Sequence, residues 1–149
     1  MSDALKSTLG AIHRMMECAD LDHALLTSQP IEASWLADYS HQRIVNSFLF
    51  NFLKIQDKVG RKFFRLVLRH WRELESDDVT MLDILHRLEQ LRVLESVEVW
   101  DRLREVRNTL TYDYPEEGDV RLETLALALR GYVELKAIVA RIEERLSSS

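Results

Sequence analysis

Five side chains near the end of one predicted helix are of types that bind phosphate groups. They lie in the stretch LREVRNTLTYDYPEE, residues 103–117, and are Arg104, Arg107, Asn108, Tyr112 and Tyr114. At 100° per residue, Arg104, Asn108 and Tyr112 fall on one i, i+4 row, and Arg107 lies two turns before Tyr114 on a neighbouring row. Two guanidinium groups, an amide and two phenols can hold a phosphate, and they can stack on or hydrogen-bond a nucleotide.

The same residues also fit a purely structural role. Arg107 can pair with Glu105 or Glu116 while the two tyrosines cover the following loop. Tyr114, with one apolar side and one polar tip, can pack on the end of a helical bundle. Spacing alone leaves both interpretations open.

The elements that must position these residues are all predicted to be helices. Apolar residues recur at spacings of three and four along most of the chain, and there are only 4 Gly and 2 Pro among 149 residues. An all-α, up-and-down bundle of about five helices in a single domain, residues 1–149, is the economical arrangement. The helices are expected over residues 3–26, over a long run that ends near 59, from 61 onwards, from 80 to about 91, from 96 to 113 or 114, and from 120 to 146.

Four residues mark the expected helix boundaries. Gly60 can kink or end the second helix, so that a third begins at Arg61. Thr80 resembles the first residue of a capping box, and Ser96 is an expected N-cap. Pro115 disfavours the helical conformation at the residue before it and should end the helix that carries the phosphate-binding types.

A basic face is predicted on the helix that begins at residue 61. Its members are Arg61, Arg65, Arg69 and Arg72. This face is a candidate for an RNA track or for the acidic surface of a protein partner. The plain alternative is a solvated helix face.

Composition excludes several classes of protein. The net charge of −5 means that a nucleic acid would have to be attracted by a local basic patch. Cys18 is the only cysteine and cannot form an intramolecular disulfide, and the N-terminus lacks a signal-peptide pattern, so a cytoplasmic location is expected. No segment reaches the roughly 18 apolar residues of a membrane span. The histidines are scattered, and no glycine-rich phosphate loop occurs, so neither a metal nor a nucleotide cofactor is predicted.

The quoted stretch, together with RIVNSFLFNFLKIQDKVGRKFF and LHRLEQLRVLESVEVWDRLR, resembles the HEPN superfamily, and within it the HepT-like toxins that are encoded beside a small nucleotidyltransferase antitoxin. The resemblance covers roughly residues 35–135. The family signature is RNxxxHxY at a helix end, and Arg107, Asn108 and Tyr114 match it. Tyr112 stands where the family has histidine. Five further residues of the second helix match polar positions of the family, with no task assigned to them: Arg43, Asn46, Lys54, Gln56 and Asp57.

The resemblance implies a dimer of helical bundles whose two signature helices face each other across a cleft and cut RNA without a metal. In such cleavage the 2′-hydroxyl attacks the neighbouring phosphorus, so one group must move a proton and cations must stabilise the phosphate oxygens. By resemblance, Arg107 binds the phosphate, Asn108 positions it or residue 112, and the antitoxin inactivates the toxin by transferring AMP to Tyr114. Histidine suits the proton transfer, whereas a tyrosine with an ordinary pKa is only about 0.1% ionised at pH 7.

Three hypotheses about function therefore remain. The chain is a HepT-like ribonuclease, weakened or detoxified by Tyr112; or it is an inactive HEPN binding module that still dimerises and binds the nucleotidyltransferase; or it is an unrelated helical bundle. An Arg107 tied into a surface ion pair in an isolated monomer would favour the third.

Overall fold

The computed structural model confirms the all-α prediction. It describes residues 1–112, 116 and 118–148, and no strand occurs within these ranges. The helical elements are α1 (Asp3–Thr27), α2 (Ala33–Leu36), α3 (Tyr39–Lys58), the π-helical turn η1 (Val59–Phe63), α4 (Phe64–His70), α5 (Met81–Gln90), α6 (Val97–Tyr112) and α7 (Gly118–Ser148).

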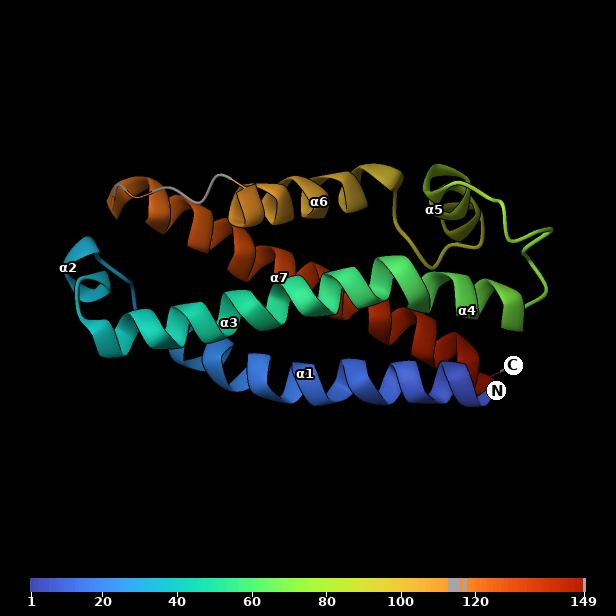
Figure 1. Ribbon diagram of the computed structural model, residues 1–149, viewed down its shortest axis with the longest axis horizontal. Helices are drawn as coiled ribbons and strands as arrows, with labels where there is room; N and C mark the ends of the chain where they lie inside the picture. Colours follow the sequence, from blue (N-terminus) through green and yellow to red (C-terminus); the bar gives the residue numbers. More distant parts are fainter. Residues whose placement is uncertain (113–115, 117, 149) are drawn as a thin grey trace.

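The long helices run roughly side by side (Figure 1). Helix α1 packs along α3, and α7 crosses behind α3 and returns towards the start of α1, so that the two chain termini lie at the same end of the molecule. Helix α6 covers α3 and α7 from the opposite side to α1, and α5 stands beside it, turned nearly end-on in this view. The α6 helix, which carries the phosphate-binding residue types, is therefore held over the middle of α3.

The core lies where α1, α3 and α7 meet. Ile12, Phe48, Phe52 and Leu135 have no exposed surface, and Tyr132 is 1% exposed. Each buried side chain of this size contributes about 1.5–3 kcal/mol relative to an exposed one, so these aromatic and aliphatic contacts hold the three long helices together.

Tyr132 carries the polar group of this core. Its hydroxyl donates a hydrogen bond to Asp20 Oδ1 at 2.7 Å, and Lys136 Nζ donates to the same oxygen at 2.8 Å. Burial, followed by the hydrogen bond to Asp20, raises the pKa of Tyr132 well above its ordinary value. Burial alone would raise the pKa of Asp20, but the hydrogen bonds from Lys136 and Tyr132 outweigh it and hold that pKa below its ordinary value.

The helix does not end at Gly60, which was one of the two alternatives expected there. Helix α3 passes through the single π-helical turn η1 directly into α4, so the predicted second and third helices are one continuous rod (Figure 1). The glycine is used for close approach instead: a Cβ built on Gly60 would lie 2.8 Å from Cζ2 of Trp100 on α6. A π-helical turn inserts one residue without ending the helix, so the rod continues through η1. Gly60, which has no side chain, can therefore lie directly against the Trp100 ring.

The predicted helix starts at Thr80 and Ser96 are confirmed. The Thr80 hydroxyl accepts a hydrogen bond from the Asp83 amide at 3.1 Å, and the Ser96 hydroxyl accepts one from the Val99 amide at 3.3 Å. These caps satisfy amides that have no partner within the helix. They determine where α5 and α6 begin, and so which α6 residues face α3.

None of the helices in the described part of the chain has the length and apolar character that crossing a membrane requires.

Candidate functional site

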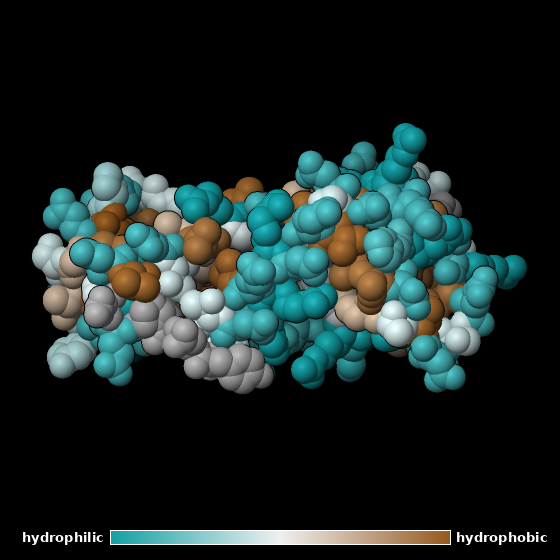
Figure 2. All heavy atoms as spheres, turned by 90° about the horizontal axis from the view of Figure 1, so that it is seen from above, coloured by the Kyte–Doolittle hydropathy of each residue, from teal (hydrophilic) through white to brown (hydrophobic). Residues whose placement is uncertain are grey.

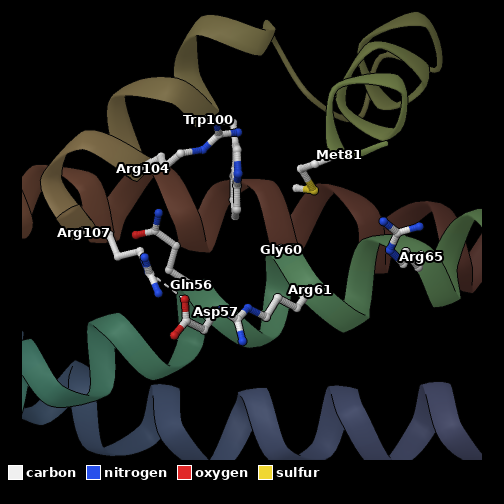
Figure 3. Close-up of a pocket in the computed structure, with 9 residues that line it drawn as sticks. All are labelled: Gln56, Asp57, Gly60, Arg61, Arg65, Met81, Trp100, Arg104 and Arg107. Atoms are coloured by element: carbon white, nitrogen blue, oxygen red, sulfur yellow. Dashed lines mark hydrogen bonds and ion pairs between the residues drawn. The ribbon is translucent and has the colours of Figure 1, made fainter. Parts of the chain in front are cut away.

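A shallow hollow of about 380 Å³ lies between the α3–η1–α4 rod on one side and α5 and α6 on the other (Figure 3). Side chains from both sides point into or along it. Its described lining residues are Gln56, Asp57, Gly60, Arg61, Arg65, Met81, Trp100, Arg104 and Arg107.

The hollow carries positive charge on a chain whose net charge is −5. Four of its described lining residues are arginines and one is a carboxylate. Seen from above, hydrophilic side chains form a band across the middle of the molecule, with apolar side chains on both sides of it (Figure 2). Guanidinium groups arranged around one concave surface are suited to bidentate binding of phosphate.

Arg107 is held by a residue that sequence spacing did not indicate. Its Nε donates to Asp57 Oδ1 on α3 at 2.8 Å, with 21% of the Arg107 side chain and 38% of the Asp57 side chain exposed. The expected pairing partners Glu105 and Glu116 are not the ones that this ion pair uses. A half-buried pair between two helices orients the guanidinium at the edge of the hollow, as Figure 3 shows.

Two other predicted site residues of α6, Arg104 and Asn108, lie next to Arg107. Arg104 reaches the hollow while its guanidinium stays within 3.7 Å of Asp101, and half of its side chain remains exposed. Asn108 is exposed, and its Oδ1 accepts a hydrogen bond from an Arg107 terminal nitrogen at 3.4 Å. The i, i+4 relation of Arg104 and Asn108 is therefore realised on a continuous helix.

Gln56 is the buried polar residue of the hollow. It is 3% exposed, and its Oε1 has no hydrogen-bond partner. A buried hydrogen-bond acceptor that is left unpaired costs about 1–3 kcal/mol. Because Gln56 lines the hollow, a ligand bound there that donates a hydrogen bond to Oε1 would remove this cost. Trp100 is 3% exposed and packs against Phe64 with ring centroids 4.9 Å apart, which gives the hollow a rigid wall.

The predicted basic face is divided by the tertiary structure. Arg61 and Arg65 line the hollow, and Arg65 also donates to the Val79 carbonyl at 3.1 Å. Arg69 pairs with Asp77 at 2.5 Å on the exposed surface. Arg72 does not belong to the face, because α4 ends at His70 and Arg72 has a left-handed backbone with φ of 58°.

Two expected site residues fall outside this description. Tyr112 is the last residue of α6, and its side chain lies outside the described part of the chain. Tyr114 lies wholly outside the described residues. The prediction that Tyr114 accepts AMP and the prediction that Tyr112 replaces a catalytic histidine therefore remain predictions.

Four residues line the hollow although sequence reasoning assigned them no role in a site: Gln56, Asp57, Met81 and Trp100. Asp57 and Arg107 are separated by fifty positions in the chain. No local spacing rule connects them, and the family resemblance marked only the polar character of Gln56 and Asp57. Within the described ranges, no group of three or more His, Cys, Asp or Glu side chains is arranged to hold a metal ion.

Comparison of the chain with protein-family models, with curated proteins and with solved structures gives no match.

Proposed function

We propose that this protein is a HepT-like ribonuclease of the HEPN superfamily that binds the phosphates of RNA in the hollow between α3 and α6. The observation that carries the proposal is the gathering of Arg61, Arg65, Arg104 and Arg107 around one concave surface of an acidic protein. Signature residue Arg107 lines that surface from α6, and Asn108 lies next to it and accepts a hydrogen bond from Arg107. Cation clusters of this kind supply the salt-dependent affinity of proteins for nucleic acids.

In the proposed reaction the RNA 2′-oxygen attacks the adjacent phosphorus and the 5′-oxygen of the next nucleotide leaves. The 2′-hydroxyl loses a proton to a base, the departing oxygen gains one, and a cyclic phosphate remains. Arg107, oriented by Asp57, stabilises the charge that develops on the phosphate oxygens, and Arg104 adds a second cation. Asn108 holds the phosphate or residue 112 in position. Tyr112 is a neutral phenol at pH 7 and a poor proton acceptor, so in this proposal it donates a hydrogen bond or a proton to the departing 5′-oxygen, and solvent takes the proton of the 2′-hydroxyl.

The proposal includes two partners. A second copy of the chain brings another α6 to the cleft, and a nucleotidyltransferase transfers AMP from ATP to the phenol oxygen of Tyr114, with release of pyrophosphate. The attached nucleotide adds an anion that competes with RNA for the arginines of α6. The positive charge of the hollow supports this mode of inhibition.

Tyr112 favours a second candidate function. Without histidine the protein lacks the side chain best suited to proton transfer near neutral pH. A binding module that keeps RNA or nucleotidyltransferase binding and does not cut RNA is the alternative. A third, a helical bundle unrelated to HEPN, would be favoured by Arg107 in a surface ion pair of an isolated monomer, whereas the observed pair with Asp57 is half-buried.

One experiment separates the three functions. The parent chain and Tyr112→His are induced in bacteria, and both purified proteins are incubated with RNA in the presence of a chelator. Growth arrest and RNA cleavage by the histidine variant support the ribonuclease proposal. If neither protein cuts RNA, but both bind RNA or a nucleotidyltransferase, the binding module is correct. If neither protein cuts RNA and neither binds RNA or a nucleotidyltransferase, both the ribonuclease proposal and the binding-module alternative are wrong.

Matched arginine variants on α6 test the location of the site. Arg104→Gln removes a cation from the hollow. Arg102→Gln removes a cation from the same helix but outside the hollow, where a terminal nitrogen of Arg102 lies 3.9 Å from Glu134 Oε2. RNA affinity and its salt dependence should fall for Arg104→Gln and stay close to the parent for Arg102→Gln. Equal losses for the two variants would refute the location.

A further inference from the structure

One exposed stripe of the α3–η1 rod leads from the N-terminus of α3 to the hollow. At 100° per residue, its members fall within an arc of about 80°. They are Tyr39, Arg43, Asn46, Phe50, Lys54 and Arg61. Each of these is solvent-exposed, whereas Val45, Phe48, Phe52 and Ile55 on the inward side of the same rod are buried.

Aromatic and cationic residues alternate along this stripe. Tyr39 is 82% exposed and Phe50 is 60% exposed, values unusual for side chains of this size. Arg43 lies between the two rings along the helix, and Lys54 Nζ stands over the Phe50 ring, 5.5 Å from its centroid. The cation covers one side of the ring, which leaves the other side for a flat partner.

The stripe is continuous with the hollow. Asp57 and Arg61 follow Lys54 on the same face, and both line the hollow, where Figure 3 shows them side by side. Asp57 is the only carboxylate between residues 39 and 61, and its Oδ1 accepts the hydrogen bond from Arg107. Three cations, Arg43, Lys54 and Arg61, are therefore exposed along the α3–η1 rod, and the acid between them is paired with a fourth cation, Arg107.

We propose that this stripe is a track for single-stranded RNA, in which bases stack on Tyr39 and Phe50 and phosphates lie on Arg43, Lys54 and Arg61 before the strand enters the hollow. The inference rests on the proposed function and specifies its substrate. Alternating rings and cations are the arrangement that binds single strands with little sequence preference, since every base has a π-face. A duplex keeps its bases stacked on one another and cannot use the rings.

The length of the stripe sets the size of the oligonucleotide. Twenty-two residues separate Tyr39 from Arg61, which corresponds to about 33 Å at the helical rise of 1.5 Å. This length accommodates at most about ten nucleotides at 3.4 Å per nucleotide of one strand, and fewer when the strand is extended. A uridine 12-mer therefore covers the stripe and the hollow, whereas a 3-mer reaches only part of them.

The test compares the affinities of these two oligonucleotides, measured by fluorescence anisotropy, for the parent, Phe50→Ala and Phe50→Leu. Loss of one stacked base should weaken 12-mer binding by about 5- to 150-fold in both variants, because leucine keeps the apolar surface and removes the ring. Binding of the 3-mer should stay nearly unchanged. Leu21→Ala, which removes a 71% exposed apolar side chain from α1, is the control and should bind both oligonucleotides like the parent.

Each other result has a distinct meaning. If Phe50→Leu binds the 12-mer as tightly as the parent, stacking on Phe50 is refuted while the hollow remains the proposed site. The same holds if Phe50→Ala and Phe50→Leu lose as much affinity for a duplex of the same length as for the single-stranded 12-mer. If Phe50→Ala changes the molar mass measured by light scattering, the stripe is a contact between copies of the chain, and the track is refuted. If the parent binds neither oligonucleotide, the track is refuted. If, in addition, Arg104→Gln and Arg102→Gln do not differ in RNA affinity, the proposed function fails as well.

Discussion

Replacement of Gly60 by alanine tests the contact that joins the two walls of the hollow. Gly60 lies in η1, and the Cβ that alanine adds would stand 2.8 Å from Cζ2 of Trp100. Carbon atoms attract best at about 3.5–4.0 Å, so the new methyl group overlaps the ring by about 0.7 Å or more. Trp100 cannot move away easily, because it is 3% exposed and packed against Phe64.

Two effects of opposite sign determine the size of the change. Overpacking in a rigid site costs about 1–3 kcal/mol, and the immobile ring places Gly60→Ala in the upper part of that range. Alanine recovers about 1 kcal/mol through its better helix propensity. The net expectation is a loss of about 1–2 kcal/mol in the free energy of unfolding, which corresponds to a Tm lowered by about 2–8 °C for a domain of this size.

Urea unfolding followed by circular dichroism gives the free energy, and Gly10→Ala is the matched control. Gly10 lies inside α1, and a Cβ there would meet only the flexible end of Arg14 at 3.4 Å. Gly10→Ala should therefore gain the helix-propensity term without the clash and stabilise the protein by about 0.5–1 kcal/mol.

The reasoning fails if Gly60→Ala is as stable as the parent or more stable. A double-mutant cycle isolates the contact: Trp100→Phe removes the ring that carries Cζ2, so Gly60→Ala should cost at least about 1 kcal/mol less in that background. Equal costs in both backgrounds would show that the loss comes from the π-helical turn and not from Trp100.

Three further predictions concern the hollow, the core and a helix cap. Gln56→Met replaces a buried acceptor that has no partner, so it should raise the free energy of unfolding by about 1 kcal/mol and weaken RNA binding; a destabilised variant would contradict the unpaired state of Oε1. Tyr132→Phe removes the hydrogen bond to half-exposed Asp20 and should cost about 1 kcal/mol. Because the folded-state pKa of Tyr132 is raised, its contribution to the free energy of unfolding is complete below about pH 10 and is lost as the pH rises further. Urea denaturation at pH 8 to 11 should therefore show a steeper alkaline fall in that free energy for the parent than for Tyr132→Phe. Parallel curves would refute the shift. Thr80→Ala removes the acceptor for the Asp83 amide and should lower stability by about 1 kcal/mol in the same urea assay, with no change signifying that solvent replaces the cap.

The parts of the site that lie along one helix were predictable. Arg104 and Asn108 share a row because a helix repeats every 3.6 residues, and α6 is continuous through both. The start of that helix was predictable for the same reason, because the Ser96 cap acts on an amide only three residues away. Predictions of this kind depend on neighbours within about one turn.

The path of the chain at Gly60 was not predictable in this way. Glycine often ends a helix, and the local sequence contains no sign that Trp100, forty positions later, needs the space. The same limit applies to Arg72, which spacing assigned to the basic face. The end of α4 at His70 and the left-handed turn that follows turn it away.

The sequence by itself determined the helical class, most helix boundaries and the types of side chain at the end of α6. Their causes are local hydrogen bonds and a periodic apolar face, which operate over three or four residues. Only the tertiary structure decided that Asp57 holds Arg107, that Gln56 is buried without a partner, and that Arg61 and Arg65 share a hollow with α6. These relations join helices far apart in the chain, and they arise from the packing of the helices against one core, which no local spacing encodes.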